Sequence, residues 1–216
     1  MPKVYIYVVD RDFGFAPNPF HGYCTLATCK PRIRKRAEVD DWVIGMGGAR
    51  LNAAGRCIFA MAITATITFD EYWSNPAYLA KRPVRNGSRK MMVGDNIYHR
   101  DSSNNEWRQA DSHHSNPDGS ANSYNLQRDT ATTDQVLISR HFFYFGSEAP
   151  VVPRRVINAI GFKNGIGHRV FSANSCSQLI TWLETTHRQS LNLFVAPPFD
   201  FDDSDRRYVG RGSKIA

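Results

Sequence analysis

Short segments of alternating hydrophobic and polar residues run through the first two-thirds of the chain and predict β-strands. Lys3–Val9 is the first of them, and its Val, Ile and Tyr content favours a strand. Residues 39–45 form a second segment, before a glycine turn. Residues 55–69 are a longer run rich in β-branched side chains, which predicts a central strand with a bend near its middle. The same composition returns at Gln135–Ser139 and at 141–145.

Three segments have the features of helices. Residues 70–73 place acidic side chains in what would be the first turn, which favours a short helix. Residues 153–160 are predicted to form another short helix. Ser175 and Gln178 have the spacing of a capping box, so we expect a helix from there to about residue 189.

The remaining segments are polar and rich in turn residues. Residues 83–128 have no regular period and predict long loops with short strands, which in a compact domain are usually functional or disordered. Residues 199–216 are first acidic and then basic, and we expect a tail that lies on the surface or is mobile. Length and pattern together predict an α+β fold in a single domain over 1–216, with a core at about 3–195.

The charge balance indicates the kind of partner. The 216 residues include 27 Lys and Arg against 20 Asp and Glu, a formal net charge of +7. Positive charge favours phosphates because binding releases counterions, so we expect DNA, RNA or a nucleotide as the partner. The alternative is a basic protein whose charge serves solubility alone. No apolar run approaches the ~20 residues of a membrane span, and the N-terminus does not fit a signal peptide. We therefore expect a cytoplasmic protein without a membrane partner.

The four cysteines lack the spacing of zinc ligands. Cys24 and Cys29 belong to no paired CxxC motif, and no ligand pair follows them. We therefore expect three of the cysteines to be buried or half-buried thiols in a reducing cytoplasm, with no metal and no cofactor. The P-loop, GxSxG and HExxH signatures of common hydrolases and nucleoside triphosphatases are also absent from the sequence.

A cluster of positive charge follows Cys29. Arg32 and Arg34 alternate with Ile33, so in an extended segment both guanidinium groups would lie on one face and could bind successive phosphates. The alternative is a solvated edge strand whose charges oppose aggregation. The residues that we expect to bind phosphates are Lys30, Arg32, Arg34, Lys35 and Arg36.

Residues 10–22 form a loop rich in Gly and Pro that contains an unusual number of aromatic rings. Phe13 and Phe15 could stack on bases, which contributes about 1–3 kcal/mol for each base. The amide of Asn18 could bind the edge of a base. The alternative is a structural loop, locked by proline, whose rings pack on the body of the protein.

Residues suited to acid–base chemistry lie in the polar segment 83–128. A carboxylate can orient an imidazole as a general base, so Asp111 with His113 or His114 is the candidate catalytic pair. Neighbouring side chains of an extended segment point to opposite sides, so at most one of the two histidines would serve a given site. The alternative is a polar loop with histidines that have only structural partners.

Longer motifs carry two resemblances. The pattern at 39–45, 55–63 and 70–73 is loosely similar to PUA-like domains such as the EVE, ASCH and YTH groups. This implies a small twisted β-barrel, or a strongly bent mixed sheet with flanking helices, that carries a pocket for a base. Motifs across about 3–150, including DRDFGFAPNPF, GDNIYH and DSHHS, resemble the nucleotide modification associated domain family of the second type. That family is associated with DNA base modification in bacteria and phages, which implies a nucleic-acid setting and leaves binding or catalysis open.

Two functions fit these features. A binding module would hold a modified base in a pocket formed by Asp10, Phe13, Phe15, Asn18, Trp42, Asn96 and Tyr98. An enzyme would act on a nucleotide, or on a DNA base extruded from the stack, through the pair of Asp111 and a histidine. A third interpretation is an interaction subunit with protein partners in a modification system. Convergence of Asp10, Asn96, Asp111 and a histidine in one cleft would favour the enzyme.

Overall fold

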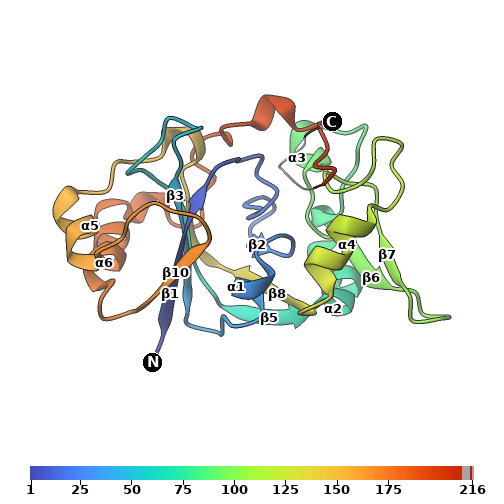
Figure 1. Cartoon of the computed structure of the whole chain (residues 1–216), viewed down its shortest axis with the longest axis horizontal. Coiled ribbons are helices and arrows are strands. Elements are labelled where there is room, and N and C mark those ends of the chain that lie inside the picture. The colour runs from blue at the N-terminus through green and yellow to red at the C-terminus, as the bar shows by residue number, and fades with distance from the viewer. Residues whose placement is uncertain (211–214, 216) are drawn as a thin grey trace.

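The computed structural model describes residues 1–210 and 215, and its largest element is a five-stranded sheet (Figure 1). The strand order is β10-β1-β3-β4-β9, in which β1 and β3 are parallel and the other neighbours are antiparallel. The strands are β1 (Lys3–Val9), β3 (Trp42–Gly47), β4 (Cys57–Ala62), β9 (His141–Tyr144) and β10 (His168–Ser172). The strand predicted at Lys3–Val9 is confirmed. The strand predicted at 39–45 begins only at Trp42, after a turn.

Two smaller antiparallel sheets complete the strands of the described residues. One has the order β2-β8-β5, and the other pairs β6 with β7. Their strands are β2 (Cys24–Leu26), β5 (Ala65–Thr68), β6 (Tyr98–Arg100), β7 (Trp107–Gln109) and β8 (Gln135–Ser139). None of the three sheets closes into a barrel within the part of the chain that the structure describes. The α+β class is confirmed, and the PUA-like barrel is not.

The run 55–69, predicted as one bent strand, is divided between two sheets as β4 and β5. The backbone N–H of Ile63 donates to the carbonyl of Asp41 at 2.8 Å, beside the five-stranded sheet. The next N–H, that of Thr64, donates to Ile138 of β8 at 2.8 Å. The hydrogen-bond partners therefore change sheets between consecutive residues, so the predicted bend is a crossing from one sheet to the other.

The helices lie around these sheets. They are α1 (Pro31–Arg34), α2 (Phe69–Ser74), α3 (Arg89–Met92), α4 (Ser123–Thr130), α5 (Arg154–Ile160) and α6 (Ser177–Thr186), with 3₁₀ turns at Pro76–Lys81, Gly146–Glu148, Arg188–Ser190 and Phe201–Asp203. α5 and α6 lie together on one side of the five-stranded sheet and contribute buried Val156, Ile160, Leu179 and Leu183 to its core (Figure 1).

Two of the predicted helices differ in how they begin. A capping box starts α2, because Thr68 Oγ1 accepts from Glu71 N–H at 3.2 Å and Glu71 Oε2 accepts from Thr68 N–H at 2.7 Å. The capping box predicted at Ser175 is wrong. Its backbone N–H and its hydroxyl bond to the Ser172 hydroxyl at 3.1 and 2.8 Å, and α6 begins after Cys176.

The aromatic loop after β1 belongs to a second hydrophobic core. Phe13, Phe15 and Phe20 are 6%, 3% and 3% exposed and pack among residues of α2, β6 and β8. A fully buried ammonium fixes the loop, since Lys81 Nζ donates to the carbonyl and Oδ1 of Asn18 at 2.9 and 2.8 Å. A buried charge needs such partners to offset its desolvation. The loop is therefore packed against the body of the protein.

The basic run after Cys29 is not extended. Residues 31–34 form α1, with Pro31 in the first turn, where its missing N–H costs no hydrogen bond. The Arg34 side chain points inward and is fully buried, with its guanidinium bound to carbonyls of Cys29, Asp129 and Gln135 at 2.9, 2.5 and 2.9 Å. Arg32 is exposed. The two arginines therefore do not share a face, which corrects the extended geometry predicted for them.

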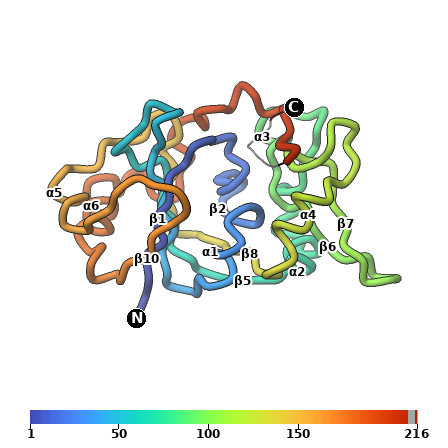
Figure 2. Tube along the Cα trace, viewed as in Figure 1, coloured from blue at the N-terminus to red at the C-terminus, as the bar shows by residue number. Residues whose placement is uncertain are grey.

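The segment after α6 crosses the molecule from the five-stranded sheet to the neighbourhood of α4, as Figure 2 shows. Asp200 forms an ion pair with Arg50 at 2.8 Å, and Tyr208 N–H donates to the His113 carbonyl at 2.7 Å. The expected surface tail is thus tied down as far as Tyr208, while 211–214 and 216 lie outside the described residues. Among the helices described, none has the length and apolar character needed to cross a membrane.

Candidate functional site

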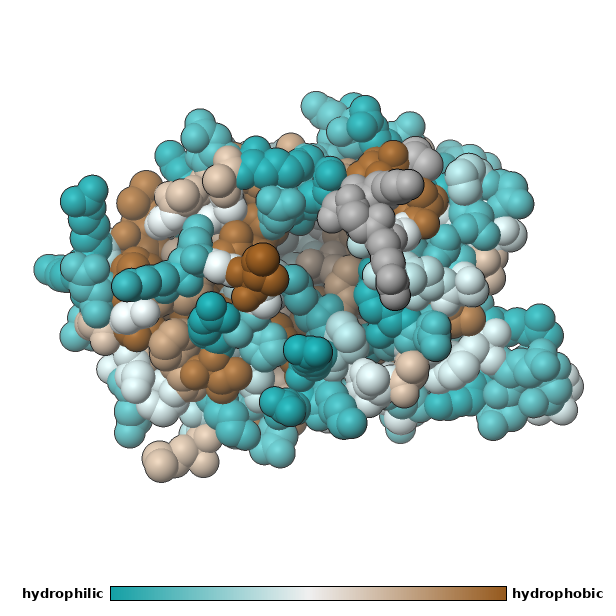
Figure 3. Space-filling view, viewed as in Figure 1, coloured by the Kyte–Doolittle hydropathy of each residue, from teal (hydrophilic) through white to brown (hydrophobic). Residues whose placement is uncertain are grey.

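A cavity of about 330 Å³ lies between the end of β1, the loop that follows it and α4. Figure 3 shows a hollow near the centre of this face of the molecule. The cavity is both aromatic and charged. Its aromatic rings are those of Tyr7, Phe13, Phe15 and Tyr208, its charged side chains are Asp10, Arg11, Lys30 and Arg128, and its other polar side chains are Cys29, His113 and His114.

Backbone geometry places Cys29 in this cavity. Cys29 and Lys30 have φ values of 57° and 42°, in the left-handed region that non-glycine residues rarely adopt. Hydrogen bonds hold the conformation, because Cys29 N–H donates to Asp129 Oδ1 at 3.0 Å and its carbonyl accepts from Arg34 Nε at 2.9 Å. Such strain persists only where the surroundings enforce it, and it is common at functional sites.

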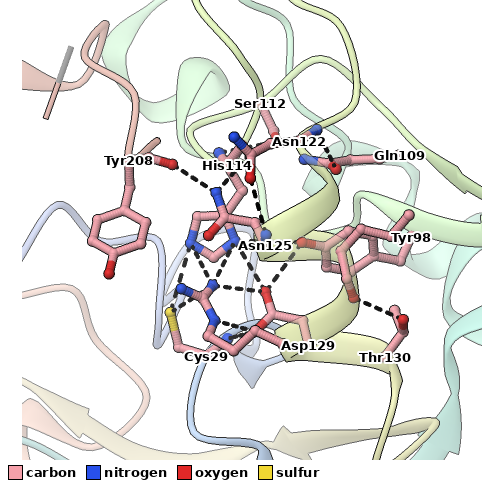
Figure 4. A network of polar contacts seen from close by, with 12 residues as sticks. Cys29, Tyr98, Gln109, Ser112, His114, Asn122, Asn125, Asp129, Thr130 and Tyr208 are labelled. Atoms are coloured by element: carbon pink, nitrogen blue, oxygen red, sulfur yellow. Dashed lines mark hydrogen bonds and ion pairs between the residues drawn. The ribbon is translucent and has the colours of Figure 1, made fainter. Parts of the chain in front are cut away.

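Cys29, His114 and Asp129 form a continuous chain of polar contacts (Figure 4). Cys29 Sγ lies 3.6 Å from His114 Nε2, and His114 Nδ1 lies 3.0 Å from Asp129 Oδ2. Asp129 is fully buried, and its Oδ2 also accepts from Tyr98 OH at 3.1 Å. A thiol, an imidazole and an orienting carboxylate in this order are the arrangement of an activated cysteine nucleophile.

Arg128 adds a positive charge to this chain. Its Nη2 lies 3.2 Å from both ring nitrogens of His114, so the guanidinium rests against the face of the ring, and it lies 3.7 Å from Cys29 Sγ. Burial opposes a thiolate at Cys29, but the positive charges of Arg128 and His114 outweigh it and hold the pKa of Cys29 below its ordinary value. Burial alone would lower the pKa of His114, yet the sulfur of Cys29 and the bond to Asp129 shift it upward. The site thus favours a thiolate and imidazolium pair.

The other thiols have the opposite electrostatics. Burial raises the pKa of Cys24 and Cys57 to about 12 and that of Cys176 to about 11. All four cysteines are free: Cys24, Cys57 and Cys176 are buried, and Cys29 is half-buried in the wall of the cavity.

The two adjacent histidines line the same cavity, because 112–115 form a turn and not an extended segment. His113 Nδ1 lies 2.7 Å from the Arg206 carbonyl, and its ring packs 4.5 Å from the ring of Phe13. Burial and the nearby charge of His114 lower the pKa of His113 to about 3. His113 is thus a neutral part of the wall, while His114 belongs to the charged chain.

Asp111, predicted as the partner of a histidine, forms an ion pair with Arg207 instead. Its side chain is 44% exposed and does not line the cavity. The carboxylate that orients His114 is Asp129, on α4. The predicted pairing of Asp111 with a histidine is therefore corrected, because the carboxylate that contacts His114 is that of Asp129.

The structure brings together some of the residues predicted for a base pocket. Asp10, Phe13 and Phe15 line the cavity, as does Lys30 from the residues predicted to bind phosphates, and the four other residues of the predicted base pocket do not. Trp42 packs against the ring of His141 at 5.7 Å, and Asn18 and Asn96 bond through their side-chain amides to backbone carbonyls. Tyr98 lies behind the site as the donor to Asp129. Of the residues predicted to bind phosphates, Arg32, Lys35 and Arg36 are exposed and Arg34 is buried.

Sequence reasoning missed Cys29, Arg128 and Asp129 as site residues. The Cys29 and His114 side chains that meet are 85 residues apart in the chain. An Arg followed by an Asp in a polar helix has no distinctive pattern. Among the missed residues only Cys29 has a signal, since it directly precedes the basic run that we expected to bind phosphates.

Comparison with known proteins supports the resemblance seen in the sequence. The family model described as nucleotide modification associated domain 2 matches residues 1–205. Searches of curated proteins and of solved structures found no match. The matched region contains all of β1 to α6, the cavity-lining Cys29, His114 and Arg128, and their partner Asp129. The chain therefore belongs to the nucleotide modification associated domain 2 family.

Proposed function

We propose that the protein is an enzyme that acts on a nucleotide or a DNA base, with Cys29 as a covalent nucleophile and His114 as the acid and base. The observation that carries this proposal is the chain of contacts from Cys29 Sγ through both ring nitrogens of His114 to Asp129, at 3.6 and 3.0 Å, at the wall of a cavity. Family membership supports a role in a nucleotide or DNA modification system.

The chemistry follows from the protonation states that the site favours. The Cys29 thiolate adds to an electrophilic carbon of the substrate, and an S–C bond forms while a π pair moves to the neighbouring oxygen or nitrogen. His114, as imidazolium, gives its Nε2 proton to that atom. In the return step the neutral imidazole takes a proton from the adduct, the electron pair that is released re-forms the π bond, and the S–C bond breaks with its electrons returning to sulfur as the thiolate. Asp129 and Arg128 act through His114 and Cys29, by orienting the ring and stabilising the thiolate.

The aromatic walls support a planar substrate. Phe13, Phe15 and Tyr208 line the cavity together with the thiol, and aromatic rings stack on bases of any sequence. A module that only binds a base has no need of a buried carboxylate, imidazole and thiol in line. That arrangement favours the enzyme over the binding module, and the rings serve substrate binding in either case.

Selective alkylation tests this proposal. We expect iodoacetamide at pH 6–7 to modify Cys29 in the folded chain and to leave Cys24 and Cys57 unmodified, as measured by peptide mass spectrometry. The thiolate is the reacting species, and the thiols of Cys24 and Cys57 stay protonated at this pH because burial raises their pKa. His114→Ala should slow the alkylation at pH 6–7, and Cys29→Ser should abolish turnover while nucleotide binding persists. A Cys29 that reacts only above the pKa of an ordinary thiol contradicts the role of nucleophile.

A further inference from the structure

A buried hydroxyl group without a partner belongs to a residue that lines the cavity. Tyr7, in the second half of β1, is 2% exposed, and no described residue forms a hydrogen bond with its hydroxyl. Buried hydroxyls normally have a partner, because leaving one unsatisfied costs free energy. Tyr7 lines the cavity together with Cys29, and since its hydroxyl has almost no exposed surface, a ligand there supplies the missing acceptor only when the side chain shifts on binding.

An ammonium group lies next to this hydroxyl-bearing ring. Lys30 Nζ is 4.2 Å from the centre of the Tyr7 ring, and Lys30 also lines the cavity. No ion pair with a carboxylate is present for Lys30 among the described residues. Burial lowers its pKa, which shows that the environment of the free protein disfavours the charge. An anion bound in the cavity would offset that penalty.

The cavity as a whole is positive. Arg11, Lys30 and Arg128 line it against the carboxylate of Asp10, and Asp129 behind the wall pairs with Arg128 at 2.9 Å, so the formal charges leave an excess of one positive charge. A phosphomonoester carries a charge of about −1.5 to −2 at pH 7 and three acceptor oxygens. It therefore matches the Lys30 ammonium in a positive cavity better than an internal phosphodiester, which has a single charge and continues in two directions.

We propose that Lys30 and Tyr7 form a subsite for the terminal phosphate of a nucleotide, so that the substrate of the Cys29 site is a nucleoside monophosphate or the phosphorylated end of a strand. This inference rests on the proposed function. The phosphate is a binding group and stays intact, while the base is held by Phe13 and Phe15 and reacts with Cys29. Lys30 follows Cys29 in the chain, and the left-handed backbone at both residues turns both side chains into one cavity.

Calorimetric binding measures the subsite directly. The four deoxynucleoside 5′-monophosphates are compared with the matching deoxynucleosides on the wild-type chain. We expect at least one monophosphate to bind at least about tenfold more tightly than its nucleoside, which corresponds to about 1.4 kcal/mol. Lys30→Met should remove that preference by weakening the monophosphate alone. Tyr7→Phe removes only the unpartnered hydroxyl, so it should keep the fold and lose part of the preference.

A matched control and two further arms keep the outcomes distinct. Arg32→Met changes an exposed cation of the same basic run and should leave the phosphate preference unchanged. A 5′-phosphorylated oligonucleotide compared with its 5′-hydroxyl form tells a free nucleotide from a strand end. Equal binding of monophosphate and nucleoside, or equal weakening of both by Lys30→Met, overturns the subsite. Release of inorganic phosphate overturns the binding role of the phosphate. Selective Cys29 alkylation without phosphate preference would leave the proposed function standing and remove this inference.

Discussion

Replacing Arg34 tests the most unexpected placement in the structure. Arg34 belongs to the basic run that we predicted to bind phosphates, yet its guanidinium is fully buried and donates to three backbone carbonyls. These carbonyls belong to the Cys29 turn, the end of α4 and the start of β8. Arg34→Ala therefore removes the donor group that these three carbonyls share at the point where these segments meet.

The expected loss of stability can be worked out from these bonds. A hydrogen bond to a charged donor contributes about 1.5–3 kcal/mol, and bonds that share one side chain are not additive. We expect Arg34→Ala to lower the free energy of unfolding by about 3–5 kcal/mol, a large part of the 5–15 kcal/mol typical of a domain. Arg32→Ala, in the same short helix but exposed, should change it by less than about 0.5 kcal/mol.

Urea unfolding followed by far-UV circular dichroism measures both variants. With a slope of about 2–3 kcal/mol per molar urea, the Arg34→Ala midpoint should fall by about 1–2.5 M and the Arg32→Ala midpoint should stay in place. Arg34→Lys should fall in between, because an ammonium keeps the charge but lacks the fork that reaches three carbonyls. Equal midpoints for both alanine variants would refute the structural role of Arg34 and would favour the original prediction that it binds phosphates.

Three further outcomes are expected. His114→Ala should lower turnover by about 10²–10⁴-fold, whereas His113→Ala should weaken substrate binding and leave the alkylation of Cys29 at neutral pH intact; identical effects of the two changes would contradict their separate roles. Burial raises the pKa of Asp12 to about 6, against about 3.9 in an unfolded chain, so its contribution to stability is present below about pH 4 and lost as the pH rises through about 6. Between pH 4 and 7, Asp12→Asn should therefore remove about 3 kcal/mol from the pH-dependent change in the free energy of unfolding, measured with urea. The part of this change that is due to Asp95, whose pKa burial also raises, should remain. Binding to an oligonucleotide should weaken with salt by a slope of about −0.7 to −0.9 in log K against log salt for each phosphate contact, and binding indifferent to salt would contradict the role of the net charge.

Much of the sheet structure could be predicted from local pattern. β1 and β8 lie at their predicted residues, because alternation of apolar and polar side chains depends on neighbours two positions away. The division of 55–69 into β4 and β5 could not be predicted. Both halves have strand composition, and the change of sheet depends on the partners of Ile63 and Thr64, which come from distant parts of the chain.

By itself, the sequence determined the α+β class, the family and the presence of aromatic rings and histidines at the site. Phe13, Phe15 and His114 were found because aromatic residues in a loop and paired histidines are uncommon enough to be noticed one by one. Only the tertiary structure decided which carboxylate and which thiol join them. Asp111 is nearer to His114 in the chain, but Asp129 meets the ring because α4 packs against the Cys29 turn through Arg34. Local sequence can show which side chains are available, whereas a site made of segments 85 residues apart exists only once long-range contacts bring them together.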